Sequence, residues 1–151
     1  MLNPTKEALY SELLSKASGL IDKQCGDTAN LANIAALLKE TFNFWWCGFY
    51  MVNANNQLEL GPFQGPVACT LISYGNGVCG SAWKQKETII VPDVHQFEGH
   101  IACSSVSNSE IVVPFFRDNN IIGVLDIDSE HFNHFDQTDQ KYLEALLKLL
   151  N

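Results

Sequence analysis

The segment SEIVVPFFRDNNIIGVLDIDS constrains the fold of this chain most strongly, because it predicts a β-hairpin that carries acids on one face. Two apolar runs, residues 109–116 and 121–129, flank a polar turn at residues 117–120. Asp126 and Asp128 are two positions apart in the second run, so both side chains project from the same face of a strand. Their apolar neighbours favour a central strand over an exposed one.

The register of this hairpin predicts that a third acid joins the pair. With a three-residue loop at residues 118–120, Arg117 pairs with Ile121, and Glu110 then lies opposite Asp128. Desolvation and like-charge repulsion in such a cluster raise at least one pKa, which keeps a carboxyl group protonated near neutral pH. The cluster therefore predicts a proton donor, with a solvated acidic strand face as the alternative.

The rest of the chain predicts helices near its two ends and strands between them. Helical spacing of apolar residues predicts helices at residues 3–26, 27–42 and 137–150, the last one capped by Asp136. Further strands are predicted at residues 45–52, 58–63, 69–73 and 88–94, with a short helix at residues 78–85. This pattern indicates one α+β domain over residues 1–151, with a central, mostly antiparallel sheet flanked by the N- and C-terminal helices.

The charge balance argues against two classes of partner. The 151-residue chain has a net charge of -8 and no cluster of Lys and Arg, so a nucleic-acid backbone or an anionic membrane would repel it. The opening residues MLNPTKEALY lack the basic and apolar regions of a secretory signal, and no apolar run approaches the length of a membrane span. We therefore expect a cytoplasmic protein.

The cysteines predict thiol chemistry. Five cysteines, an odd number, without a secretory signal argue against a structural disulfide framework. Cys25 and Cys47 are expected to be structural, since free cysteine usually behaves as a small apolar residue. Cys69, Cys79 and Cys103 lie at the ends of elements or in loops, where a sulfur stays accessible. Cys79 also begins a helix, whose N-terminal N–H groups stabilise a thiolate, so the three together predict a redox centre.

Zinc is the alternative use of these thiols. Cys79, Cys103, His95 and His100 supply four possible ligands, but the chain has no CxxC pair and these spacings match no structural zinc pattern. We therefore expect no metal.

A binding pocket is predicted from aromatic residues and a glycine turn. Trp46 and Tyr50 are four apart on one strand and share a face with Gly48, so they can form pocket walls. Ordinary core packing of the two rings is an equally good interpretation. The turn at residues 75–77, Gly-Asn-Gly, can offer backbone N–H groups to an anion such as a carboxylate.

Six ordered motifs resemble those of the GAF-domain free methionine-(R)-sulfoxide reductases. They are WxGFY, LGPFQGPVAC, GxGVCG, DVHQFEGHIAC, SEIVVP and IGVLDIDS, and they run from about residue 46 to residue 129. The resemblance implies a single GAF fold that reduces free L-methionine (R)-sulfoxide to methionine. It also implies that the protein holds no cofactor, forms a homodimer and is recycled by thioredoxin or another dithiol.

The resemblance also implies a role for each candidate residue. Cys103 looks like the attacking nucleophile, Cys69 its resolving partner and Cys79 an auxiliary thiol. The acidic positions that bind the substrate and supply a proton are Glu110, Asp126 and Asp128, and the aromatic pocket is formed by Trp46 and Tyr50. The chain departs from the family pattern at Asn76, where arginine is frequent, and at Ser104, where aspartate is frequent.

The residues also fit this chemistry independently of the resemblance. Thiolate attack on a sulfoxide needs an acid to protonate the oxygen and a second thiol to convert the resulting sulfenic acid into a disulfide. The alternative is a sensory GAF module that binds a small ligand such as a cyclic nucleotide. Such a module has no need for three accessible thiols, which favours the enzyme.

Overall fold

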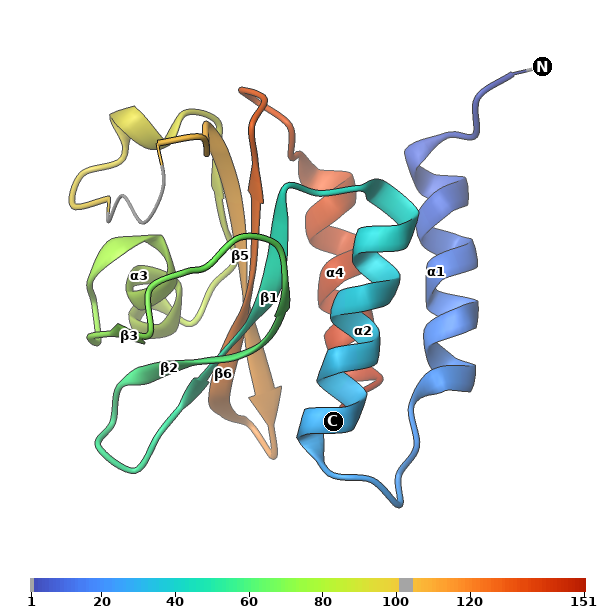
Figure 1. The fold of residues 1–151 in the computed structure, drawn as a ribbon, viewed down its shortest axis with the longest axis horizontal. Helices are drawn as coiled ribbons and strands as arrows, with labels where there is room; N and C mark the ends of the chain where they lie inside the picture. Colours follow the sequence, from blue (N-terminus) through green and yellow to red (C-terminus); the bar gives the residue numbers. More distant parts are fainter. Residues whose placement is uncertain (1, 101–104) are drawn as a thin grey trace.

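Within residues 2–100 and 105–151, which the computed structural model describes, the chain forms one six-stranded antiparallel sheet with helices on both faces (Figure 1). The strand order is β3-β2-β1-β6-β5-β4. The strands are β1 (Trp46–Val52), β2 (Leu58–Gln64), β3 (Leu71–Ile72), β4 (Ile89–Val91), β5 (Ser109–Arg117) and β6 (Asn120–Ser129). The helices are α1 (Lys6–Leu20), α2 (Asp27–Phe42), α3 (Gly77–Gln85) and α4 (Gln137–Lys148), with a 3-10 turn η1 at Val94–Gln96. The predicted α+β architecture is confirmed.

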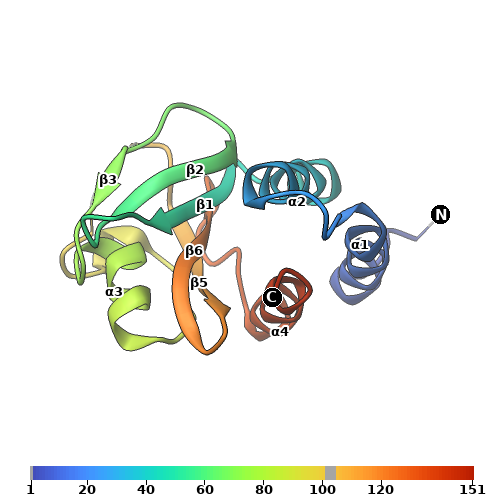
Figure 2. The same cartoon turned by 90° about the horizontal axis from the view of Figure 1, so that it is seen from below.

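The helices divide unequally between the two faces of the sheet. Helices α1, α2 and α4 form a three-helix layer on one side, in which α2 and α4 contact the strands and α1 packs outside them (Figure 2). Helix α3 lies on the other side, next to the edge strand β3. Each side has its own apolar core, because side chains alternate between the faces of a strand. Cys47, Phe49 and Leu125 face the three-helix layer, whereas Trp46 and Tyr50 face α3.

The hairpin of β5 and β6 has the predicted acidic register but a different turn. Glu110 lies opposite Asp128, as the sequence predicts. The turn contains two residues, Asp118 and Asn119, so Arg117 pairs with Asn120 and not with Ile121. Both turn residues have positive φ, 51° and 65°, as a two-residue turn with the right-handed twist of the strands requires. A register shift after position 115 compensates for the shorter turn.

Several elements are shorter than predicted. Helix α1 begins after Thr5, whose side chain accepts a hydrogen bond from the Ala8 N–H at 3.1 Å, and it ends at Leu20 instead of near residue 26. Strand β4 ends at Val91, before a proline that lacks the N–H needed to continue the ladder. Among the described residues, no helix combines the length and the apolar composition that crossing a membrane requires.

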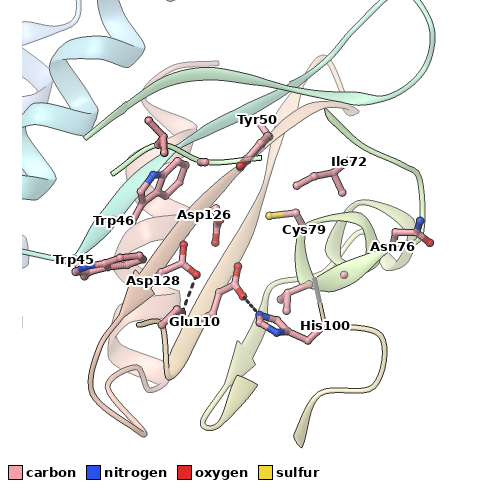
Figure 3. A pocket seen from close by; sticks show the side chains of 15 residues that line it. Trp45, Trp46, Tyr50, Ile72, Asn76, Cys79, His100, Glu110, Asp126 and Asp128 are labelled. Carbon is pink, nitrogen blue, oxygen red and sulfur yellow. Dashed lines mark hydrogen bonds and ion pairs between the residues drawn. The ribbon is translucent and has the colours of Figure 1, made fainter. Parts of the chain in front are cut away.

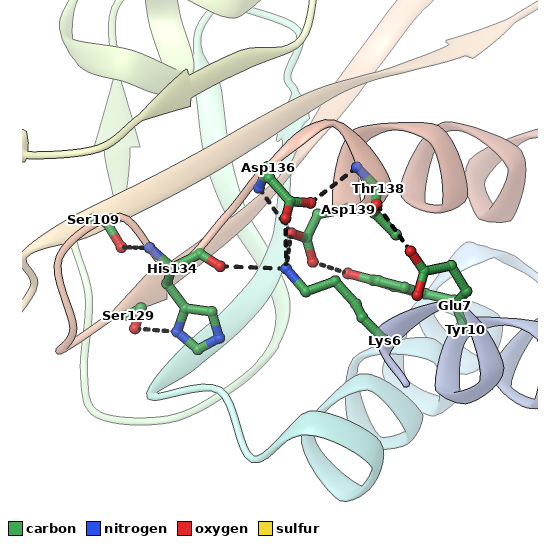
Figure 4. Close-up of polar contacts among 9 residues, drawn as sticks. All are labelled: Lys6, Glu7, Tyr10, Ser109, Ser129, His134, Asp136, Thr138 and Asp139. Carbon is green, nitrogen blue, oxygen red and sulfur yellow. Dashed lines mark hydrogen bonds and ion pairs between the residues drawn. The ribbon is translucent and has the colours of Figure 1, made fainter. Parts of the chain in front are cut away.

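A buried polar network attaches the first helix to the last (Figure 4). The carboxylate of Asp139 is 1% exposed and accepts hydrogen bonds from Tyr10 Oη at 2.6 Å and Lys6 Nζ at 2.7 Å. The same carboxylate accepts a hydrogen bond from the Asp136 N–H, which completes a capping box at the start of α4. Because a buried carboxylate needs such partners, this network holds α1 against the start of α4.

Candidate active site

A pocket lies between the sheet and α3, on the face opposite the three-helix layer (Figure 3). Strand register places its main side chains together, since Trp46 pairs with Asp128 and Gly48 pairs with Asp126 in neighbouring strands. Aromatic residues therefore lie beside acids on a single sheet face. Helix α3 closes the pocket from the other side with Cys79.

The three predicted acids converge in this pocket. Glu110 is 5% exposed and Asp126 is 6% exposed, while Asp128 is partly buried. Ser107 Oγ donates a hydrogen bond to Asp128 Oδ1 at 3.4 Å, and His100 Nε2 lies 3.9 Å from Glu110 Oε1. Asp126 Oδ1 is buried and has no hydrogen-bond partner within the described part of the chain. The pocket thus holds one acid whose oxygen is available to a ligand.

Burial shifts the proton affinity of all three acids in the same direction. It raises the pKa of Glu110 well above its usual value, and the charges of Asp126 and Asp128 raise it further. The pKa of Asp128 is also raised well above its usual value, by burial and then by Asp126. Burial raises the pKa of Asp126 as well, although its neighbours Glu110 and Asp128 oppose this shift. The cluster therefore retains a proton at pH values where an exposed carboxyl group has lost it.

This cluster is expected to lower the stability of the fold as the pH rises. The pKa values of these acids are higher in the folded state than in the unfolded chain. Between about pH 4 and the folded-state pKa values the unfolded chain therefore binds fewer protons, and the free energy of unfolding falls as the pH rises. Asp126→Asn and Glu110→Gln should each raise the free energy of unfolding at pH 8 by about 0.5–2 kcal/mol. Urea unfolding at pH 5 and pH 8 measures this change. The exposed Glu130 supplies the control, Glu130→Gln, and identical pH dependence in all variants would contradict the prediction.

The structure combines the two interpretations of Trp46 and Tyr50, since both rings are buried in the apolar core on this face and both line the pocket as an aromatic wall. The rings of Trp46 and Tyr50 stack with centroids 5.9 Å apart, and both line the pocket. Trp46 Nε1 donates to the Pro66 carbonyl at 3.0 Å, and Tyr50 Oη donates to the Cys69 carbonyl at 3.0 Å. The wall therefore also holds the segment that carries Cys69.

Gly48 is needed for a reason that the sequence did not show. A Cβ at this position would lie 2.2 Å from the Cβ of Phe63 on β2. The missing side chain therefore allows β2 to approach closely, and the Phe63 ring stacks on Trp46 with centroids 5.3 Å apart. Gly48 therefore permits the close packing of β2 against β1 and does not itself line the pocket.

The environment of Cys79 differs from the prediction. Its side chain is 4% exposed, although the sequence predicted an accessible sulfur. Burial raises the pKa of its thiol well above the usual value, and the charges of Asp126 and Glu110 raise it further. These effects outweigh the N-terminus of α3, which the sequence predicted to stabilise a thiolate. Cys79 is therefore a protonated thiol in the pocket wall.

The other cysteines divide among different environments. Cys47 is buried as predicted, donates to the Ala35 carbonyl at 3.4 Å, and has its pKa raised by burial to about 12. Cys25 is exposed, contrary to the prediction, because α1 ends before it and leaves it in a turn. Cys69 is half-buried next to the pocket wall. Cys103 and Ser104 lie outside the described residues.

Three of the aromatic and polar residues that line the pocket, Trp45, His100 and Ser107, had no predicted role in binding a substrate. Trp45 and Ser107 line the pocket, but nothing in their sequence context distinguishes them from other strand and loop residues. The sequence indicates His100 only as one member of a possible zinc site. Its supposed partner His95 is largely exposed, pairs with Asp93 at 2.8 Å and does not line this pocket. Burial and the nearby His95 lower the pKa of His100, so its imidazole favours the neutral form.

Known proteins are similar to this chain in sequence and in fold over most of their length. The sequence profile of the GAF domain matches residues 31–150. GAF domain-containing protein A of Dictyostelium discoideum is 57% identical over 97% of this chain and 93% of its own. Free methionine-R-sulfoxide reductase of Saccharomyces cerevisiae is 45% identical over 99% of this chain and 87% of its own. The X-ray structure of free methionine-R-sulfoxide reductase from Neisseria meningitidis in complex with its substrate is 51% identical. The two structures superpose with a TM-score of 0.95, and the match covers 99% of this chain and 90% of the Neisseria meningitidis chain.

Proposed function

Since this chain belongs to the GAF-domain family, in the group that includes the free methionine-R-sulfoxide reductases, we propose that it reduces free L-methionine (R)-sulfoxide to L-methionine. One observation carries the proposal: three acids with raised pKa values meet an aromatic wall in a single pocket. Such a pocket provides a protonated acid, and a carboxylate for a cationic group, within reach of one small ligand.

The pocket suits a free amino acid because both charged ends of such a ligand find partners. Asp126 Oδ1 has no hydrogen-bond partner among the described residues, so it can accept from the ammonium group. The N–H groups of Gly75 and Asn76 already donate to backbone carbonyls, so the N–H groups in the first turn of α3, from Gly77 onward, are those left to bind the carboxylate. Trp46 and Tyr50 pack against the apolar part of the substrate. Each of the two polar contacts satisfies a buried polar group whose lack of a partner otherwise costs free energy.

The reaction begins with attack of the Cys103 thiolate on the sulfoxide. Negative charge develops on the sulfoxide oxygen, and the protonated carboxyl of the cluster neutralises it by donating a proton. Loss of methionine leaves a sulfenic acid on Cys103. Glu110 and Asp128 are the donors that we favour, because their pKa values are raised well above the usual range.

A second thiol then removes the sulfenic acid. Cys69 attacks the oxidised sulfur, releases water and forms an intramolecular disulfide with Cys103. The hydrogen bond between Tyr50 Oη and the Cys69 carbonyl supports this role, since it holds Cys69 next to the pocket. Cys79 is a slower substitute, because its raised pKa keeps it protonated.

The proposed cycle needs an external dithiol and no resident cofactor, since the cysteines carry the electrons. Thioredoxin fits that role, as the disulfide must be reduced after each turnover. Such a cycle suits the reducing cytoplasm. We further propose that residues 1–151 act as one GAF domain and that the enzyme is a homodimer.

Removing acids from the cluster tests the proposal. Glu110→Gln and Asp126→Asn should each lower kcat/KM by roughly 10² or more, because the acid and the substrate ligand are lost. The wild-type rate should also decline at alkaline pH as the shared proton leaves, with an apparent pKa that belongs to the cluster. Steady-state assays with methionine (R)-sulfoxide measure both effects. Glu130→Gln is the control, and near-normal rates in both pocket variants would leave the acids with only a structural role.

A further inference from the structure

The pocket assembles a set of potential metal ligands that the sequence spacing does not reveal. Cys79 Sγ and one carboxylate oxygen each of Glu110 and Asp126 all lie within 4.8 Å of one another, and all three residues are buried. Zinc bonds of 2.0–2.3 Å in a tetrahedral site place neighbouring ligand atoms roughly 3.5 Å apart. The present spread of up to 4.8 Å is wider than that spacing, so binding draws the three ligand atoms closer together.

A second observation points to a cation at the same place. Asp126 is 6% exposed, and its Oδ1 has no hydrogen-bond partner within residues 2–100 and 105–151. Its carboxylate lies on the pocket face of the sheet, with Cys79 and Asp128 nearby (Figure 3). A buried acceptor without a donor costs about 1–3 kcal/mol, and a cation relieves that cost directly.

The donor set selects the kind of cation. One thiolate sulfur and two carboxylate oxygens suit zinc, which accepts sulfur and oxygen ligands together. Magnesium and calcium prefer oxygen ligands alone. His100 Nε2, 3.9 Å from Glu110 Oε1, can hold that carboxylate in position from outside the ligand set. A water molecule would complete the four ligands that zinc usually takes.

We propose that Cys79, Glu110 and Asp126 form a binding site for zinc-class divalent cations. Binding releases the Cys79 thiol proton and the protons held by the two acids, and it involves no transfer of electrons. The bound ion occupies the space beside the acids. The metal site does not rest on the proposed function, because it follows from the ligand atoms alone.

Cobalt chloride serves as the probe, because cobalt bound to a thiolate absorbs in the near ultraviolet. The reduced, metal-free protein is titrated with Co²⁺ and then with zinc chloride. We expect one Co²⁺ per chain, a thiolate-to-cobalt band that zinc abolishes, and tighter binding at pH 8 than at pH 6, since the ligands must lose protons. The band should disappear in both Cys79→Ala and Cys79→Ser. Asp126→Asn should weaken binding at least about tenfold.

Control variants distinguish this site from other thiols. Cys25→Ser changes an exposed cysteine and should bind cobalt like the wild type. Survival of the band in Cys79→Ala would overturn the proposal, and so would its loss in Cys69→Ser or Cys103→Ser. If the Cys79 variants do not fold, as judged by circular dichroism, Asp126→Asn decides the matter, because an unchanged cobalt affinity in that variant overturns the site.

A competition measurement separates the metal site from the proposed function. Methionine (R)-sulfoxide should displace cobalt from the wild-type protein, because both ligands use the same acids. If the sulfoxide leaves a Cys79-dependent band unchanged, the metal site stands and the proposed position of the substrate is wrong.

Discussion

Replacing Cys103 with serine is expected to abolish catalytic turnover and to leave the fold intact. A serine hydroxyl is a much weaker nucleophile than a thiolate at neutral pH and cannot form a sulfenic acid. The measurement is the rate of methionine formation with dithiothreitol as reductant, with circular dichroism as the check on folding. A variant that keeps a tenth or more of the wild-type kcat has lost only about 1.4 kcal/mol in the barrier, which would refute this assignment of the nucleophile.

Cys69→Ser is the matched control for that experiment, because it leaves the attacking thiol in place. It should release about one methionine per subunit without reductant, since attack precedes resolution. Its turnover with thioredoxin should collapse. Mass spectrometry should find the added oxygen on Cys103. Finding it on Cys79 would exchange the two roles, although the burial of Cys79 and its raised pKa argue against that outcome.

Blocking either charged end of the substrate should also have a large effect. A closed pocket that binds both the ammonium and the carboxylate of an amino acid leaves buried groups unpaired when the ligand is acylated or esterified. Sites of this kind discriminate by about 10⁴-fold or more, far beyond the effect of a missing methylene group. N-acetyl-methionine sulfoxide and peptides that contain methionine sulfoxide should therefore be nearly inert.

The measurement is kcat/KM for each substrate, with the free amino acid as reference. Asp126 provides a specific check, since its Oδ1 is the buried acceptor without a partner among the described residues. Asp126→Asn should reduce the preference for the free amino acid as well as the rate. If a peptide sulfoxide is reduced at a rate within tenfold of the free amino acid, the pocket is open and the proposed substrate class is wrong.

The sequence predicts the acidic cluster well because the cluster depends on strand periodicity. Alternating apolar and acidic residues place Asp126 and Asp128 on one face, and the hairpin brings Glu110 opposite Asp128. The predicted turn was one residue too long, yet the acidic register is correct. The shift after position 115 restores the same pairing.

The environment of Cys79 could not be predicted from the sequence, because the residues that raise its pKa come from other elements. Local reasoning detects the start of a helix at Cys79, but the acids facing it belong to β5 and β6. Ser107 and Trp45 were missed for a similar reason, since only the folded chain places them in the pocket wall. The early end of α1 leaves Cys25 exposed, and although Gly19 lies next to that end, the helical spacing of apolar residues continues through Ile21.

One assay tests the central claim most directly: the purified protein is incubated with racemic methionine sulfoxide and dithiothreitol, and the products are separated by chiral chromatography. We predict that the (R) epimer is converted to free methionine while the (S) epimer remains, and that Glu110→Gln slows this conversion strongly. Absence of free methionine, with a folded protein and reduced thiols, would contradict the account and favour a sensory domain that binds a small ligand without chemistry.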